Sequence, residues 1–308
     1  MAFLAGVIAA GLWWSAAAAP ASVSVDKTEY HGWKDCWRIS NGSVELVVVP
    51  QIGRIMRFGY VSGPNMLWEN PDQQGKAAPD SGTDWINYGG DKLWPAPQKD
   101  WNWPPDSVLD RGELSVRATG AGLIAHGKPS SGLVFEREIK MDAESGVVTI
   151  LDRLTNVSKQ AADKSVWEIC QTDNPDSVVL PISKTDDAPN GWIALAEARG
   201  IERLISPVGD DGEAVRIQRD SKEGRKIGSQ SHAGHVTVFK GDTTFNMSTD
   251  VEEGLPYPDG GCPEEVYLSP DPAAYVELEL LGPIRHLTPG QSTSIEVRWE
   301  LSRAGKSG

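Results

Sequence analysis

The chain has 308 residues and a formal net charge of −14 at pH 7, which disfavours nucleic acid and anionic membranes as partners. Its three cysteines and five histidines show none of the spacings typical of a metal site, and the sequence has no nucleotide-binding or serine-hydrolase motif. We therefore expect no metal and no cofactor. Three cysteines allow one disulfide, but the sequence does not indicate which two would form it.

The first residues have the composition of a secretory signal peptide. They carry no charge and form an apolar, alanine-rich stretch up to Ala19, where Ala19-Pro20-Ala21 offers small residues to a signal peptidase. A short membrane anchor is the alternative, but the glycines and the serine make the segment less apolar than a spanning helix. We expect cleavage of residues 1–21 and export to the periplasm or the medium, which leaves residues 22–308 as one domain.

Short apolar runs with a period of two dominate the rest of the chain, and glycine, proline, asparagine and aspartate separate them. No segment shows a sustained helical period. The pattern predicts an all-β protein, a large antiparallel sandwich. The strands are expected at Val44–Pro50, Ile55–Val61, Leu133–Met141, Val147–Leu154, Ser165–Gln171, Trp192–Ala196, His235–Phe239, Tyr275–Leu281 and Ser294–Leu301.

The segment from Trp85 to Asp106 combines aromatic, polar and turn-forming residues. Four tryptophans fall between residues 85 and 103, Gly89-Gly90 permits close approach of the backbone to a ligand, and the prolines predict a rigid loop outside the sheets. Indoles cover the apolar face of a pyranose, while amides and charged groups bind its hydroxyls. The candidate sugar-binding residues are Asn87, Asp91, Lys92, Trp94, Gln98, Trp101 and Trp103. The alternative is a tryptophan-rich loop that only closes one end of the sandwich.

The strand Tyr275–Leu281 places Glu277 and Glu279 on one face and apolar residues on the other. Two carboxylates about 7 Å apart in a closed cleft would raise each other's pKa and supply a proton acceptor. The alternative is an exposed face with solvated acids, one of them paired with Arg298.

Three further groups are candidates for the same cleft. Trp167 and Gln171 share a face of the predicted strand Ser165–Gln171, although a core tryptophan would give the same pattern. Arg54 follows an early turn and offers donors to a sugar, unless it forms an ordinary ion pair. His235, or His232 close to it, is a candidate general acid near neutral pH.

Several strings resemble one known family over about residues 40–302. They include Ile52-Gly-Arg-Ile55, Asn65-Met-Leu-Trp68, Tyr88-Gly-Gly-Asp-Lys-Leu-Trp-Pro-Ala-Pro-Gln98 and Leu287-Thr-Pro-Gly-Gln291. The family is a domain family of unknown function in the galactose-mutarotase-like superfamily. The resemblance implies a β-supersandwich that binds a mono- or oligosaccharide on a concave face.

The resemblance also implies a possible reaction. Aldose 1-epimerases open a pyranose with a carboxylate base and a histidine acid, so Glu277 or Glu279 would be the base here. The histidine motif of those enzymes is not visible. A non-catalytic glycan-binding module is one alternative. A polysaccharide lyase or hydrolase is another, and a lyase would need Arg54, Lys92 or Lys226 to neutralise a uronate. The sequence does not indicate the oligomeric state.

Overall fold

The computed structural model describes residues 21–79, 84–196, 200–209, 211–220 and 222–303. The predicted signal peptide therefore lies outside the described residues, apart from Ala21. Within these ranges, no helix has the length and apolar character needed to cross a bilayer.

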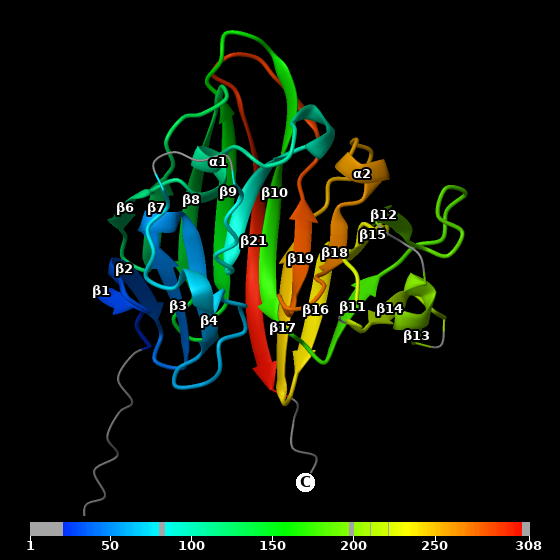
Figure 1. Cartoon of the computed structure of the whole chain (residues 1–308), viewed down its shortest axis with the longest axis horizontal. Helices are drawn as coiled ribbons and strands as arrows, with labels where there is room; N and C mark the ends of the chain where they lie inside the picture. Colours follow the sequence, from blue (N-terminus) through cyan, green and yellow to red (C-terminus); the bar gives the residue numbers. More distant parts are fainter. Residues whose placement is uncertain (1–20, 80–83, 197–199, 210, 221, 304–308) are drawn as a thin grey trace, which may run out of the picture.

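Two large antiparallel sheets pack face to face (Figure 1). The eleven-stranded sheet contains, from edge to edge, β1 (Ser24–Tyr30), β2 (Trp33–Ser40), β3 (Val44–Val49), β4 (Arg54–Tyr60), β5 (Asp91–Ala96), β10 (Ala162–Asp173), β19 (Tyr275–Leu281), β18 (Glu264–Leu268), β15 (Arg225–Ser229) and β12 (Ile193–Ala196), with β20 (Arg285–Leu287) paired to β10. The ten-stranded sheet contains β13 (Ile205–Val208), β14 (Ala214–Ile217), β11 (Ser177–Pro181), β16 (His235–Lys240), β17 (Thr243–Thr249), β21 (Ser292–Arg303), β9 (Val148–Asn156), β8 (Leu133–Met141), β7 (Gly122–His126) and β6 (Ser115–Ala118).

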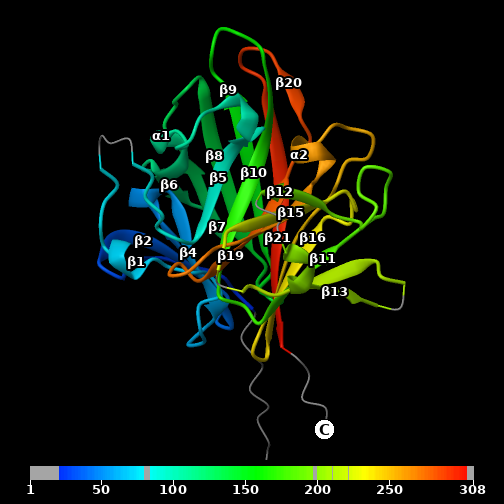
Figure 2. The same cartoon turned by 45° about the vertical axis from the view of Figure 1, so that its right-hand side comes forward.

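Helices are short and lie in the connections. They are α1 (Ser107–Arg111), α2 (Pro258–Gly261) and the 3-10 turns η1 (Pro50–Ile52), η2 (Pro71–Gln73), η3 (Gln98–Asp100) and η4 (Ile201–Leu204). Figure 2, turned by 45°, shows β5, β10 and β19 side by side in the middle of the eleven-stranded sheet. The architecture confirms the predicted all-β antiparallel sandwich, and each strand predicted from the period of two is present.

The core between the sheets follows from this alternation. In β8 every second residue is buried, as expected for a strand with one face on a core. Phe58 of one sheet packs against Phe245 and Trp299 of the other, with ring centroids 5.2 Å apart in both pairs. All three cysteines are buried and none forms a disulfide, so the disulfide that the composition allows is absent.

One prediction about the backbone is wrong. The proline-rich segment was expected to lie outside the sheets, yet residues Asp91–Ala96 form β5, which pairs with β10 along its length. The other edge of β5 pairs with β4 only between Ile55 and Asp91. At Pro95 the carbonyl accepts a hydrogen bond from Nε1 of Trp101, 2.8 Å away, so this part of the strand turns its hydrogen-bonding groups away from β10. The missing N–H of Pro95 therefore costs no ladder hydrogen bond.

Gly89 and Gly90 let the chain enter β5 in tight contact with its neighbours. Both have positive φ, 91° and 71°. A Cβ atom on Gly90 would collide with the carbonyl oxygen of Ile55, and one on Gly89 with that of Trp68. Glycine at both positions therefore fixes where β5 starts, and so which of its residues face the core.

Candidate functional site

Six of the thirteen predicted site residues lie on one face of the eleven-stranded sheet, which we call the outer face because it points away from the second sheet. Alternate residues of β5, β10 and β19 project to it, while the residues between them enter the core. Antiparallel pairing of β10 with both neighbours brings residues from three distant parts of the chain together. They are Lys92, Trp94, Trp167, Ile169, Gln171, Glu277 and Glu279.

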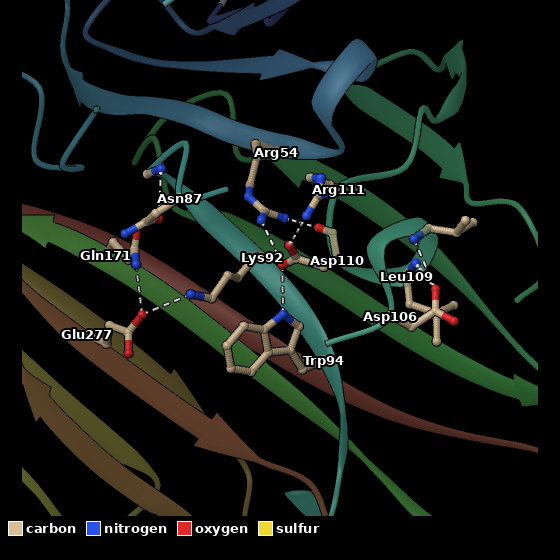
Figure 3. Close-up of polar contacts among 12 residues, drawn as sticks. Arg54, Asn87, Lys92, Trp94, Asp106, Leu109, Asp110, Arg111, Gln171 and Glu277 are labelled. Carbon is tan, nitrogen blue, oxygen red and sulfur yellow. Dashed lines mark hydrogen bonds and ion pairs between the residues drawn. The ribbon is translucent and has the colours of Figure 1, made fainter. Parts of the chain in front are cut away.

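Gln171 and Lys92 both point toward Glu277 on this face (Figure 3). Its Oε1 accepts hydrogen bonds from Nζ of Lys92, 2.9 Å away, and from Nε2 of Gln171, 2.8 Å away. Within the described residues, Oε2 has no hydrogen-bond partner, and the side chain keeps 11% of its surface exposed. Two buried donors thus hold a carboxylate whose second oxygen is available to a ligand.

Glu279 is one pleat away, and its Oε2 has two partners. Its Oε2 accepts from Nε1 of Trp167 at 2.6 Å and lies 2.8 Å from Nζ of Lys226, which also pairs with Glu265 at 2.5 Å. Burial raises the pKa of Glu279, although Lys226 opposes the shift. Burial would lower the pKa of Lys226, but Glu265 and Glu279 outweigh it and raise that pKa. Glu279 is only 1% exposed, so Glu277 is the more accessible of the two acids.

Together, Lys92, Gln171, Glu277, Lys226, Glu265 and Glu279 form what we call the outer-face cluster. Its lysines also contact the central indoles. Nζ of Lys92 lies 4.4 Å from the ring centroid of Trp94, and Nζ of Lys226 lies 4.2 Å from that of Trp167. The two indoles pack edge to face, with centroids 5.4 Å apart, and are 6% and 2% exposed. Trp94 and Trp167 therefore pack against the two lysines and leave little indole surface on which a sugar could stack.

The accessible indoles lie beside these two. Trp103 is 56% exposed, and its ring contacts that of Trp85 at 5.1 Å between centroids. Trp85 is partly exposed, and its ring centroid is 5.2 Å from Nζ of Lys92. Trp101, also partly exposed, packs against Trp94 at 5.6 Å. A flat apolar surface therefore adjoins the lysine that holds Glu277.

Arg54 was expected to donate to a sugar, and this expectation needs correction. Its guanidinium is 1% exposed and binds Asp110 of α1, with Nη2 2.8 Å from Oδ1. The same oxygen accepts from Nε1 of Trp94 at 2.7 Å (Figure 3). Arg54 and Asp110 thus fix the orientation of Trp94 and have no free surface for a ligand.

Asp91 was also expected to bind a sugar, and it too lies elsewhere. It precedes Lys92 by one residue and so points to the opposite side of β5, into the space between the sheets. There it is fully buried, 2.5 Å from Nη1 of Arg137 on β8. Arg137 also pairs with Asp152 at 2.7 Å and with Glu168 at 3.3 Å. We call these four residues the inter-sheet cluster.

His235 lies on β16 of the ten-stranded sheet, where its Nδ1 is 3.3 Å from the carbonyl of Ala233. It makes no contact with Glu277 or Glu279 in the described structure, so we do not retain it as their partner. Gln98 is in η3, and its carbonyl accepts from the backbone of Trp101. Asn87 lies at the turn before Gly89. Its side-chain Oδ1 accepts a hydrogen bond from the backbone N–H of Gly89, 3.2 Å away.

Sequence reasoning missed Glu265 and named Lys226 only as a cation that a lyase would need. Lys226 on β15 and Glu265 on β18 reach the outer face through the pairing of these strands with each other and with β19. Tyr267 lies on the same face and is partly exposed. The alternation in Glu264–Leu268 was a usable signal for the strand, but nothing local indicates that it lies beside β19. Among the described residues, no group of three or more metal-binding side chains has the arrangement of a metal site.

Known structures share this architecture. A putative aldose 1-epimerase from Escherichia coli aligns over 92% of this chain and 100% of its own, with a TM-score of 0.55 and 11% identity. A galactose mutarotase-like protein from Lactobacillus casei aligns over 87% and 100%, with a TM-score of 0.58 and 8% identity. One from Clostridium acetobutylicum aligns over 92% and 99%, with a TM-score of 0.55 and 8% identity. At these identities the likeness establishes the fold, which is galactose-mutarotase-like as the sequence predicted.

Comparison with curated proteins gives no match. The model of one family, described as a domain of unknown function (DUF4380), matches residues 36–302. That range includes every strand from β3 to β20 and all residues of the outer-face cluster. The chain therefore belongs to the DUF4380 family of galactose-mutarotase-like β-sandwich proteins.

Proposed function

We propose that the protein binds a carbohydrate on the outer face of the eleven-stranded sheet. One observation carries the proposal: Lys92 connects a partly exposed indole to a carboxylate with a free oxygen. Its Nζ lies 5.2 Å from the ring centroid of Trp85 and 2.9 Å from Oε1 of Glu277. A pyranose offers an apolar C–H face to an indole and hydroxyl donors to a carboxylate. To use both, it needs the indole and the carboxylate within about one ring width of each other.

The rigidity of the site supports the same function. Lys92 and Gln171 are buried and hydrogen-bonded to Glu277, so their side chains lose little rotamer freedom when a ligand arrives. Gln171 and Lys92 come from paired strands rather than from loops. Such preorganisation favours the recognition of small polar ligands, whose hydroxyls must meet fixed partners.

Titration of tryptophan fluorescence with monosaccharides tests the proposal. We expect saturable quenching, because the indoles of Trp85 and Trp103 adjoin the site. The change Glu277→Gln keeps the shape of the side chain but removes its charge, and should weaken binding about tenfold. Glu300→Gln is the matched control, since Glu300 is exposed on β21 of the other sheet. Equal binding by both variants, or no saturable response to any sugar, contradicts the proposal.

Aldose 1-epimerase activity is a second candidate, and the free oxygen of Glu277 supports it. In this reaction Oε2 of Glu277 takes the proton of the anomeric hydroxyl, the bond between C1 and the ring oxygen breaks, and the ring oxygen accepts a proton. None of the described histidines contacts Glu277, so Lys92 is the candidate donor, with its Nζ 2.9 Å from the same carboxylate. Ring closure on the other face of the carbonyl reverses both transfers.

Polarimetry on freshly dissolved α-glucose and α-galactose tests this candidate. Epimerase activity predicts faster mutarotation than in buffer alone, and a loss of that acceleration in Glu277→Gln but not in Glu300→Gln. The choice of Glu277 over Glu279 follows from exposure, because Glu279 is bonded to Trp167 and Lys226. If mutarotation is no faster with the protein than in buffer alone, the epimerase candidate is contradicted and only the proposed binding function stands.

A further inference from the structure

The charges of the outer-face cluster bear on which sugars it accepts. Three carboxyl groups, those of Glu265, Glu277 and Glu279, face two ammonium groups, those of Lys92 and Lys226. Burial raises the pKa of Glu265 well above its usual range, while the charge of Lys226 opposes that shift. With all five groups ionised, the cluster has a net charge of −1, because its carboxyl groups outnumber its cations.

Neither ammonium group is free to bind an acidic ligand. Nζ of Lys92 is held by Glu277 at 2.9 Å and by the face of Trp94 at 4.4 Å. Nζ of Lys226 is held by Glu279 at 2.8 Å and by Glu265 at 2.5 Å. Recruiting either lysine to a ligand carboxylate would break an existing pair and leave a buried glutamate without its cation, which is costly.

The guanidinium group of Arg54, which binds the same oxygen of Asp110 as Trp94, is engaged as well. Arg54 is 2.8 Å from Asp110 and almost fully buried. Lys164, close to Trp101 at the end of β10, pairs with Asp100 at 2.6 Å. Arg54 and Lys164 thus have carboxylate partners, as Lys92 and Lys226 do.

One acceptor oxygen, in contrast, remains available. Oε2 of Glu277 has no protein donor in the described residues, and the side chain is the most exposed of the three acids. Oε1 of Glu265 is buried without a hydrogen-bond partner. Burial raises the pKa of the nearby Tyr267, and the charges of Glu277 and Glu279 raise it further, which indicates a negative potential at this surface.

We propose that the site accepts neutral and amino sugars and rejects sugar acids and sugar phosphates. This proposal rests on the proposed carbohydrate-binding function and adds the charge class of the ligand. The ammonium group of a 2-amino sugar would find an unpaired carboxylate oxygen at Glu277. A uronate or phosphate would meet the same oxygen with a like charge, and the outer-face cluster offers it no unpaired cation.

Fluorescence titration with matched sugars tests the charge class. The set is glucose and galactose, their 2-amino forms glucosamine and galactosamine, and their acids glucuronate and galacturonate. Within each series we expect the amino sugar to bind at least as tightly as the neutral sugar, and the acid to bind about tenfold more weakly at low salt. Glu277→Gln should reduce the difference in affinity between the amino sugar and the sugar acid, whereas the control Glu300→Gln should leave that difference unchanged.

The outcomes separate the two proposals. If a uronate binds as tightly as its neutral sugar, the charge selectivity is overturned while the sugar site stands. If none of the six sugars gives a saturable response, both proposals fail. An unchanged gap in Glu277→Gln, with selectivity intact in the wild type, also overturns the assignment of that selectivity to Glu277.

Discussion

The protein contains two clusters of paired charges that share the strands β5 and β10, and they differ in their access to solvent. The inter-sheet cluster and the outer-face cluster are both anchored on β5, through the adjacent residues Asp91 and Lys92. In the inter-sheet cluster Arg137 is almost fully buried, and its three acidic partners are fully buried. In the outer-face cluster, Glu277 keeps 11% of its side chain exposed and one oxygen without a protein donor.

This difference shows how one strand, β5, can contribute both to stability and to the proposed recognition of a ligand. A period of two sends Asp91 into the core and Lys92 to the outer face. A cluster that is sealed from solvent cannot reach a ligand, so it can only hold the sheets together. A cluster that reaches solvent with an unused oxygen can take a ligand. Changes in the first should alter folding, and changes in the second should alter binding.

The largest expected effect comes from breaking the inter-sheet cluster. Arg137→Leu removes the cation from three buried carboxylates and should lower the free energy of unfolding by about 3–5 kcal/mol. Chemical denaturation measures this loss. The matched control is Arg298→Leu, because Arg298 forms exposed pairs with Asp250 and Glu296 and should cost less than about 1 kcal/mol. Similar losses in both variants would contradict a special role for Arg137.

An intermediate effect is expected from pH. Burial raises the pKa of Asp91 to about 6 in the folded protein, against the opposing charge of Arg137. Between about pH 4 and 6 the folded state holds a proton on Asp91 that the unfolded state has released. The stabilisation that this proton gives the folded state is therefore fully present at low pH and is lost as the pH rises through 6. Asp91→Asn should remove that dependence, so the stability advantage of wild type over variant should shrink from pH 4 to pH 7.

Denaturation curves across this range provide the measurement. Asp250→Asn is a suitable control, because hydrogen bonds from Arg298 lower the pKa of Asp250 at the surface and its pH dependence has the opposite sign. A difference between wild type and Asp91→Asn that stays constant or grows with pH would show that Asp91 is ionised throughout.

The smallest expected effect on stability comes from the accessible indoles. Trp103 is 56% exposed, so Trp103→Ala should change the free energy of unfolding by less than about 1 kcal/mol. Because its ring packs on Trp85, the variant should bind sugar a few-fold more weakly. The same change at Trp299, buried in the core, should cost about 3–5 kcal/mol. Unchanged sugar affinity in Trp103→Ala would remove this indole from the site.

Local patterns predicted the sandwich and half of the site. Alternation alone placed Glu277 and Glu279 on one face of their strand, and Trp167 and Gln171 on one face of another strand. In the structure the two strands are paired, and these four residues share one face of the sheet. Pro95 misled the prediction for β5, because a proline is compatible with a strand wherever its missing N–H faces an unpaired edge.

Other features depend on contacts that no local pattern encodes. Whether Asp91 or Lys92 faces the core is set by where β5 starts, and that depends on the packing of Gly90 against β4. The pairing of Lys226 with Glu279 requires β18 to lie between β15 and β19. Strand order of this kind is determined by the whole fold.

A crystal structure of the protein soaked with a neutral or amino monosaccharide tests the central claim most directly. We expect a pyranose with its C–H face on Trp85 and a hydroxyl or ammonium group within hydrogen-bond distance of Oε2 of Glu277. The contacts of Lys92 and Gln171 with the other oxygen should be unchanged. A sugar bound elsewhere, with Oε2 of Glu277 occupied by a group of the protein itself, would contradict the account.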